Sequence, residues 1–203
     1  MKTILFSPVY LDDNGQKKLD RWIEYYGESP IQYGQMMFAA DGYGSSTDEC
    51  LYPNVIQFPN HLGRHSHLGY AGWWRSFYTM KLLMAPDVDK IVFIEQDAFV
   101  LTKRLADYIN NSNSGWLAPF CETHRFPESA LQIINKDAFG KFHWFTSGNF
   151  WENVGKVAET ILPFTQIMTQ FNCDRYGEKG LSQTKDMDLY CQANLDTIVR
   201  FDL

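Results

Sequence analysis

The segment from Lys90 to Val100 constrains the fold more than any other part of this 203-residue sequence. It reads K-I-V-F-I-E-Q-D-A-F-V, so that four consecutive apolar residues lead directly into acidic ones. An uninterrupted apolar run of this kind is typical of a strand that is buried on both faces, as in parallel sheets covered by helices on either side. We therefore expect a layered α/β architecture in which this segment is a central strand.

The rest of the chain alternates between strand and helix patterns. The first strand is expected over residues 2–10, with a break at Pro8, and a helix over 16–26, whose apolar residues recur at spacings of three and four. The alternation indicates an α/β fold with a mostly parallel central sheet and helices on both faces, in a single domain spanning residues 1–203. Further strands are expected at 31–40, 55–58, 115–120, 130–134 and 198–201, and helical segments at 73–84, 105–109, 137–145, 153–162 and 186–194.

Composition narrows the function classes. The chain has 18 Lys and Arg against 24 Asp and Glu, a net charge of −6, which makes nucleic acid an unlikely partner because phosphate-binding domains are usually basic. No apolar stretch approaches the ~18 residues of a transmembrane helix, and no signal peptide is recognisable, so we expect a soluble, cytoplasmic protein. The four cysteines form no C-x-x-C pair and are expected to be reduced thiols.

Glu95 and Asp97 are the strongest candidates for a functional site. On an extended backbone, residues two apart point to the same side. Acid-x-acid spacing alone is weak evidence, because about three matches are expected by chance in such an acidic chain. Only Glu95 and Asp97 end a buried strand, where open α/β sheets place their ligand crevice. Two converging carboxylates repel each other unless a cation, a ribose hydroxyl or a basic residue compensates, and a solvated strand end or a structural arginine partner is the alternative. The three matches are Asp87/Asp89, Glu95/Asp97 and Asp186/Asp188.

Three segments, I-V-F-I-E-Q-D, T-I-L-F-S-P-V-Y and M-M-F-A-A-D-G-Y, resemble the nucleotide-sugar glycosyltransferases of the GT-A fold, a Rossmann-like α/β architecture. The resemblance covers most of the chain. It implies that Asp97 binds a divalent metal and that Glu95, which stands where the family has an aspartate, contacts ribose or metal. It also assigns donor-binding roles to Ser7, Pro8, Tyr10 and Asp41, which lie near the ends of the first two strands. Arg75, at the start of the helix over 73–84, is assigned the same role.

A divalent metal is also reasonable on chemical grounds. A diphosphate leaving group gains negative charge as the glycosidic bond breaks, and Mn²⁺ or Mg²⁺ held by one or two carboxylates neutralises it. The sequence has no P-loop to do this instead. We therefore expect a metal-dependent glycosyltransferase that moves a sugar from a nucleotide-sugar donor, with UDP as the first candidate nucleotide, to a hydroxyl of a glycan, lipid-linked or protein acceptor.

Other motifs are further candidates for the site, the first two of them by the same resemblance. In K-D-M-D-L-Y, Asp186 and Asp188 match the acidic residues that act as base toward the acceptor in inverting enzymes, although they could simply cap a helix. The loop 146–149 is similar to one that frames donor sugar and acceptor, and Glu122 and His124 could face the same crevice. The histidine-rich segment 61–67 is interpreted as a loop that closes over the diphosphate with Arg64, not as a zinc site.

Two other functions remain open. A sugar-phosphate nucleotidyltransferase would require a glycine-rich, basic loop after the first strand, where this chain has S-P-V-Y-L-D-D. A non-catalytic carbohydrate- or protein-binding domain would use Trp73, Trp74, Trp144 and Trp151 as a platform. The high aromatic content, 16%, fits a carbohydrate site, because the apolar faces of sugars stack on aromatic rings. Rings in suitable segments are those of Tyr10, Tyr43 and residues 143–151.

Overall fold

The computed structural model of the chain describes residues 1–43, 54–175, 187–196 and 198. These residues form one ten-stranded sheet in the order β3-β2-β1-β4-β8-β6-β9-β10-β5, with β7 paired to β6. The first four strands of that order are mutually parallel, and β8 lies antiparallel between β4 and β6. The strands in the first half of the sheet are β1 (Thr3–Leu11), β2 (Gln35–Tyr43), β3 (Val55–Gln57), β4 (Lys90–Ile94) and β8 (Leu131–Asn135).

The second half of the sheet continues the parallel direction through β6, β9 and β10, and β5 closes the edge antiparallel to β10. A short antiparallel hairpin adds β7 to β6. The sheet as a whole is therefore mostly parallel, as predicted. These strands are β5 (Phe99–Val100), β6 (Trp116–Cys121), β7 (Phe126–Pro127), β9 (Gln166–Asp174) and β10 (Leu189–Tyr190).

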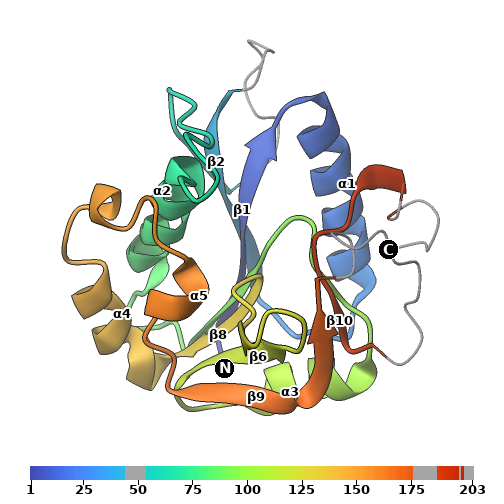
Figure 1. Cartoon of the computed structure of the whole chain (residues 1–203). Helices are drawn as coiled ribbons and strands as arrows, with labels where there is room; N and C mark the ends of the chain where they lie inside the picture. The colour runs from blue at the N-terminus through green and yellow to red at the C-terminus, as the bar shows by residue number, and fades with distance from the viewer. Residues whose placement is uncertain (44–53, 176–186, 197, 199–203) are drawn as a thin grey trace.

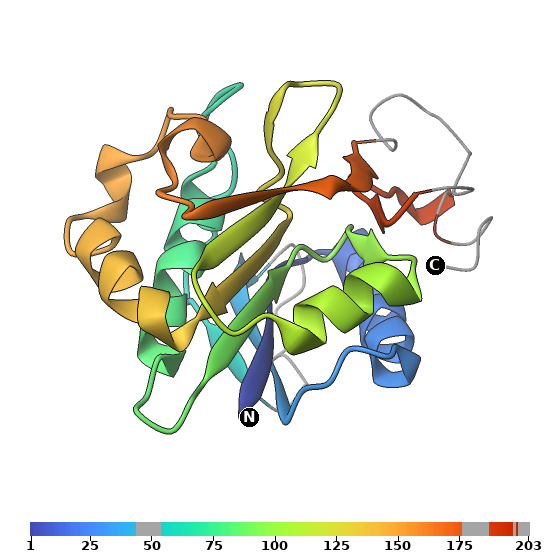
Figure 2. The same ribbon diagram turned by 90° about the horizontal axis from the view of Figure 1, so that it is seen from below.

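Helices cover both faces of the sheet, which Figures 1 and 2 show from two directions. Helices α1 (Asp13–Glu28) and α3 (Lys103–Asn111) lie on one side, and α2 (Ala71–Thr79) and α4 (Phe139–Phe145) on the other. The predicted α/β class, with a central sheet between two helical layers, is confirmed. The shorter helical elements are α5 (Ala158–Ile161), η1 (Met80–Leu83), η2 (Lys136–Ala138) and η3 (Phe150–Glu152).

Strand β4 divides the core into two layers. Val92 and Ile94 pack in the cluster that contains α1 and α3, whereas Ile91 and Phe93 pack in the cluster that contains α2 and α4. All four side chains are completely buried. At about 1.5–3 kcal/mol for each large apolar side chain, their burial is a large contribution to stability. The apolar run of the sequence therefore identified the central strand correctly.

Helix α1 fixes the segment that follows β4. Its first turn is capped by Asp12, whose carboxylate accepts a hydrogen bond of 2.6 Å from the backbone nitrogen of Gly15. On its buried side, Trp22 Nε1 donates to the carbonyl of Glu95 at 3.1 Å, and the Tyr26 hydroxyl donates to the carbonyl of Ala98 at 3.0 Å. These bonds hold both ends of the turn that carries Glu95 and Asp97.

Two of the predicted elements are wrong. Strand β1 does not break at Pro8 but continues to Leu11, with a register shift after Val9. Its pairing with β4 ends at Phe6, so Pro8 lies where only β2 is a neighbour and the missing N–H is tolerated. The predicted helix at 186–194 is replaced by strand β10, because pairing with β9 and β5 outweighs the local helical pattern.

Several boundaries also differ. The helix predicted at 153–162 is only the single turn of α5, and the one at 73–84 is α2 followed by η1. Strand β9 was not predicted at all. Ile198, expected in a strand, is helical, and the rest of 198–201 lies outside the described residues. None of the helices in the described part of the chain is both long and apolar enough to span a membrane.

Candidate active site at the end of strand β4

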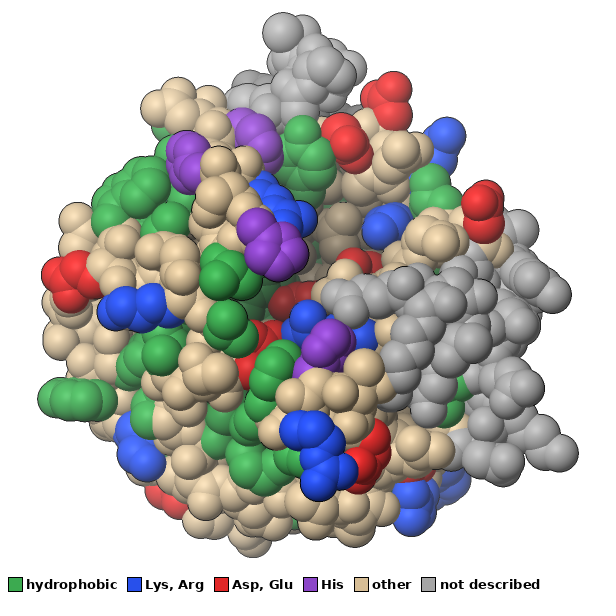
Figure 3. All heavy atoms as spheres, viewed as in Figure 1, with side chains coloured by type: hydrophobic (Ala, Val, Ile, Leu, Met, Phe, Trp, Pro, Cys, Tyr) green, Lys and Arg blue, Asp and Glu red, His purple; other side chains and the backbone are tan. Residues whose placement is uncertain are grey.

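A pocket of about 390 Å³ opens where the carboxyl ends of β1, β2 and β4 meet. Figure 3 shows a hollow on this face of the molecule, with acidic side chains at its floor and basic and histidine side chains around it. The pocket lies at the edge of the sheet where open α/β folds bind ligands. It is lined by Pro8, Val9, Tyr10, Asp41, His61, Gly63, Arg64, Tyr70, Gly72, Trp73, Glu95, Gln96 and Asp97.

Glu95 and Asp97 both line this pocket, but not because they share one side of a strand. Strand β4 ends at Ile94, and a turn follows in which the Ala98 nitrogen donates to the carbonyl of Glu95 at 3.0 Å. The turn brings Gln96 into the pocket lining as well. Both residues therefore line one pocket without the extended backbone that the prediction assumed, and their binding of a ligand stays a prediction.

The Glu95 carboxyl is in an unfavourable place for a negative charge. Burial, reinforced by repulsion from Asp97 and Glu128, raises its pKa to about 8, although a hydrogen bond of 2.7 Å from Trp73 Nε1 partly compensates. A cation between the two carboxylates would remove this penalty. The site is thus arranged to favour a bound positive charge.

The donor set fits Mg²⁺ or Mn²⁺ better than zinc. No three His, Cys, Asp or Glu side chains among the described residues are grouped to share one metal ion. Glu95 and Asp97 supply two hard carboxylates, and Mg²⁺ commonly binds through one or two carboxylates while substrate phosphates and water complete its coordination. The two residues could therefore hold such an ion together with a diphosphate.

Gln96 connects two of the strands that form the pocket. Its Oε1 accepts a hydrogen bond of 2.9 Å from the backbone nitrogen of Tyr10, which joins the turn after β4 to the end of β1. The Tyr10 ring, 36% exposed, packs on the His61 ring with centroids 4.5 Å apart. Pro8 and Tyr10 line the pocket as predicted for donor-binding residues, whereas Ser7 is fully buried behind it.

Asp41 and Arg75 are brought together as an ion pair. The Asp41 carboxylate also accepts a hydrogen bond of 2.7 Å from the Gly63 nitrogen, and His61 Nδ1 lies 3.1 Å from it. A Cβ at Gly72 would be 1.8 Å from Asp41 Oδ2, so only glycine allows α2 to approach so closely. Asp41 lines the pocket and Arg75 does not; together they hold the chain near residue 63 against α2. Their direct contact with a donor stays a prediction.

Solved structures similar to this one include glycosyltransferases. A glycosyltransferase involved in the glycosylation of the major capsid of PBCV-1 matches with a TM-score of 0.56 and 12% identity, covering 100% of both chains. The glycosyltransferase GlyE of Streptococcus pneumoniae TIGR4 matches with a TM-score of 0.55 and 9% identity, covering 97% of this chain and 56% of that one. This chain has the GT-A fold.

A third structure, the galactosyltransferase LgtC in complex with donor and acceptor sugar analogs, matches with a TM-score of 0.46, 11% identity and coverage of 93% of this chain and 86% of that one. No protein-family model and no curated protein sequence matches the chain significantly. The similarity is therefore in the fold and does not assign roles to individual site residues.

Within this GT-A fold, Asp188 does not reach the pocket. Its side chain is 3% exposed and is held by the Arg104 guanidinium, by Thr102 Oγ1 at 2.5 Å and by the Asn172 nitrogen at 2.8 Å. Burial opposes ionisation, but the hydrogen bonds from Arg104 and Thr102 prevail and lower the pKa of Asp188. Asp188 thus joins α3, β9 and β10 and does not cap a helix. Asp186, the other predicted base, lies outside the described residues.

The remaining predicted site segments lie apart from the pocket lining. Glu122 forms an exposed ion pair with Arg125 at 3.2 Å, and His124 stacks on Phe126 with ring centroids 5.4 Å apart. In the loop 146–149, Asn149 caps η3 by accepting a hydrogen bond from the Trp151 nitrogen at 3.1 Å. Arg64, in contrast, does line the pocket, as expected for a residue that faces a diphosphate.

A buried acidic cluster near the pocket was not predicted from the sequence. Glu128 is 1% exposed and is bound by Arg175, whose Nε lies 2.8 Å from Oε2; Arg175 also pairs with Glu159. Glu128 raises and Arg175 lowers the pKa of Glu95, so the cluster influences the candidate metal site. No pattern in the sequence could have found it, because Glu128 and Arg175 are 47 residues apart.

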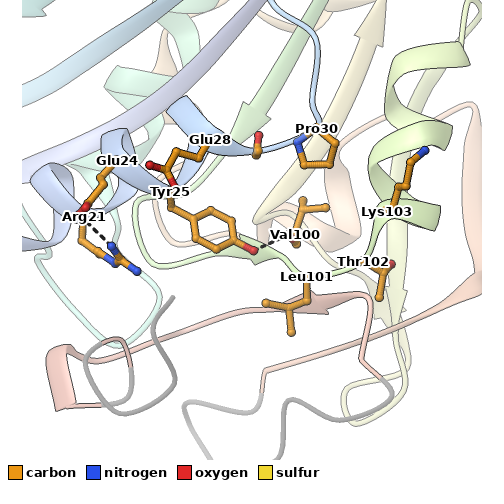
Figure 4. Close-up of a pocket in the computed structure, with 10 residues that line it drawn as sticks. Arg21, Glu24, Tyr25, Glu28, Pro30, Val100, Leu101, Thr102 and Lys103 are labelled. Atoms are coloured by element: carbon orange, nitrogen blue, oxygen red, sulfur yellow. Dashed lines mark hydrogen bonds and ion pairs between the residues drawn. The ribbon is translucent and has the colours of Figure 1, made fainter.

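A second cavity, of about 290 Å³, lies between the end of α1 and the start of α3 (Figure 4). The Tyr25 hydroxyl lies in it and donates to the Val100 carbonyl at 2.7 Å. Its basic side chains are paired within their own helices, Arg21 with Glu24 at 2.8 Å and Lys103 with Asp107 at 2.6 Å. The pocket at the end of β4 has the better chemistry for a charged substrate.

Proposed function

We propose that this protein is a metal-dependent glycosyltransferase that moves a sugar from a nucleoside diphosphate sugar, with UDP as the nucleotide, to an acceptor hydroxyl. One observation carries the proposal: two carboxylates, Glu95 and Asp97, line one pocket at the carboxyl end of β4. The GT-A fold supports the same conclusion, because the similar structures are glycosyltransferases.

The Glu95 carboxyl is held from helix α2. Trp73 Nε1 donates to Oε1 of Glu95, which fixes the carboxyl group and leaves lone pairs free on both of its oxygens. Asp97 and Glu95 would hold Mn²⁺ or Mg²⁺ in this position. A bound divalent ion stabilises the charge that develops on the diphosphate leaving group.

The donor would extend from these carboxylates toward the end of β1. The bond between Gln96 and the Tyr10 nitrogen keeps the two strand ends at a fixed distance. The exposed Tyr10 ring, backed by His61, offers a flat surface for the nucleoside base. The nucleoside and diphosphate would therefore bind to groups that are already positioned, which reduces the entropic cost of binding.

Arg64 supplies positive charge to the lining of the pocket. Its Nε donates to the Ser66 carbonyl at 2.8 Å and one terminal nitrogen donates to the His67 carbonyl at 2.7 Å. The guanidinium lies 4.7 Å from the Tyr70 ring centroid. A cation held in this way can contact the donor phosphates without first losing side-chain freedom.

The test is calorimetric titration with UDP, with and without Mn²⁺, together with an assay for UDP-sugar hydrolysis. We expect UDP binding to depend on Mn²⁺ and to weaken roughly tenfold or more in Asp97→Asn, since one hard ligand is lost. Asp87→Asn is the matched control, because Asp87 belongs to another acid-x-acid pair and its side chain is 66% exposed in an ion pair with Lys2.

Four results would contradict the proposal. The first two are a failure of UDP to bind in the presence of Mn²⁺, and equal UDP binding by Asp97→Asn and Asp87→Asn. Release of pyrophosphate from a nucleoside triphosphate would instead indicate a nucleotidyltransferase. Glycan binding that ignores both metal and nucleotide would indicate a non-catalytic carbohydrate-binding domain.

A further inference from the structure

Two exposed aromatic rings lie at the pocket or next to it. Most large apolar side chains of the described core are almost completely buried, yet Tyr70 is 42% and Trp151 is 46% exposed. Tyr70 lines the pocket together with Arg64. The Trp151 ring packs on His65, the neighbour of Arg64, with centroids 5.8 Å apart. We call Tyr70 and Trp151, with Arg64 and His65 between them, the aromatic rim.

The rings of the aromatic rim are held in place. The Trp151 ring stacks on Phe150 with centroids 5.1 Å apart, and Asn149 caps the turn that carries both. That turn is bound to α2, since Asn153 Nδ2 donates to the Tyr78 hydroxyl at 2.7 Å. A large ring that is fixed and still exposed favours ligand binding, because little conformational entropy is lost when a partner covers it.

We propose that the aromatic rim is the acceptor subsite and that the acceptor is a saccharide, one of whose sugar rings stacks on Trp151. This inference rests on the proposed glycosyltransferase function. A pyranose has an apolar C–H face and a polar edge, and the rim offers groups for both: the exposed rings of Trp151 and Tyr70, and the polar side chain of His65 beside Trp151. A lipid chain would be better served by a continuous apolar groove.

The position of the rim also fits an acceptor. The carboxylates and the end of β1 form the floor and one wall of the pocket, where the donor would bind. The aromatic rim lies at the start of α2. Arg64 contacts Tyr70 and the adjacent His65 contacts Trp151, so this segment connects the pocket to the Trp151 ring. An acceptor stacked there would present a hydroxyl toward the donor sugar.

The experiment compares variants in transfer from a UDP-sugar to methyl glycopyranosides of glucose, galactose and mannose. We expect Trp151→Ala to raise the KM for the glycoside roughly three- to tenfold, while Trp151→Phe, which keeps a ring, recovers most of the loss. The dissociation constant of UDP should not change in either variant. Trp144→Ala is the matched control, because Trp144 is 73% exposed on α4 and packs on neither the pocket nor the rim.

Three outcomes separate this inference from the proposed function. If the protein hydrolyses UDP-sugar but Trp151→Ala behaves as Trp144→Ala does with every glycoside, the subsite is refuted and the transferase proposal stands. The subsite is also refuted if the protein transfers sugar only to a peptide or lipid-linked acceptor and Trp151→Ala leaves that transfer unchanged. If UDP neither binds nor is hydrolysed, the proposed function fails. Saturation-transfer NMR with the same methyl glycosides measures acceptor binding directly. We expect the saturation-transfer signal of the glycosides to disappear in the folded Trp151→Ala variant.

Discussion

Replacing Arg175 with methionine should destabilise the protein strongly. Arg175 is the only basic partner that the described contacts give to Glu128, whose side chain is 1% exposed, and it also pairs with Glu159, whose side chain is 9% exposed. Methionine keeps most of the apolar stem but removes the charge. The two carboxylates then lose their cation and, within the described part of the chain, keep only hydrogen bonds from the Ala130 nitrogen to Glu128 and from Ser129 Oγ to Glu159. Breaking a buried pair in this way costs about 3–5 kcal/mol.

The expected loss can be converted into a measurable shift. With a urea dependence of about 2 kcal/mol per molar for a domain of this size, a loss of about 4 kcal/mol lowers the urea midpoint by about 2 M. Arg125→Met is the matched control: Arg125 pairs with Glu122 at 3.2 Å, but the two side chains are 75% and 63% exposed. An exposed pair of this kind contributes about 0–1 kcal/mol.

The pH dependence provides an independent check. Burial raises the pKa of Glu128 above its ordinary value of 4.5, and Arg175 partly offsets this. Without Arg175 the pKa in the folded state rises further, so the folded form binds more protons than the unfolded form above pH 4.5 and its stability falls as pH rises. The deficit of Arg175→Met should therefore shrink as the pH falls from 7 toward 4.5. Equal midpoints for Arg175→Met and Arg125→Met, or a deficit independent of pH, would refute the reasoning.

Three further predictions concern other buried groups. Gly72→Ala should lower stability by about 1–3 kcal/mol and weaken UDP binding, because the new Cβ would be 1.8 Å from Asp41 Oδ2. A Cβ at Gly140 would meet nothing beyond its own helix within 4 Å, so Gly140→Ala should change neither stability nor UDP affinity. Thermal denaturation and calorimetry measure the two effects. Burial lowers the pKa of Lys90 to about 8. Between pH 8 and 10 the unfolded form therefore binds more protons than the folded form, and the free energy of unfolding should rise with pH. Urea titrations should show this rise for the unmodified protein and not for Lys90→Met. Asp188→Asn should lower stability by about 1–3 kcal/mol yet leave UDP affinity intact, and a folded variant whose kcat falls more than about 100-fold would instead support Asp188 as the base.

The central part of the fold could be predicted because its signal is local. The apolar run of β4 lies within a few consecutive residues, and both faces of that strand are indeed covered. The same holds for the two carboxylates that follow it, since the end of a buried parallel strand is a ligand crevice whatever the details of the turn. Position in the sheet, not the assumed extended backbone, made the prediction succeed.

The features that escaped prediction depend on residues far apart in the chain. Asp188 precedes a two-residue strand that exists only through pairing with β9 and β5, so its local sequence still has the pattern of a capped helix. Asp41 reads as a strand-end carboxylate free to bind a ligand, but Arg75, 34 residues away, pairs with it. Such contacts follow from the tertiary fold, and spacing along the sequence does not encode them.

The hydrogen bond between Trp73 and Glu95 gives the pocket an intrinsic optical reporter. Indole emission responds to charge near the ring, and the Trp73 nitrogen lies 2.7 Å from a carboxylate oxygen that would change its electrostatic surroundings on binding a cation. Trp74 and Trp116 are instead buried in the apolar core, and the buried Trp22 donates to the backbone carbonyl of Glu95, not to its carboxylate. Titration of the unlabelled protein with Mn²⁺ or UDP should thus change its fluorescence through Trp73, which makes Trp73→Phe the reference for every affinity measured in this way.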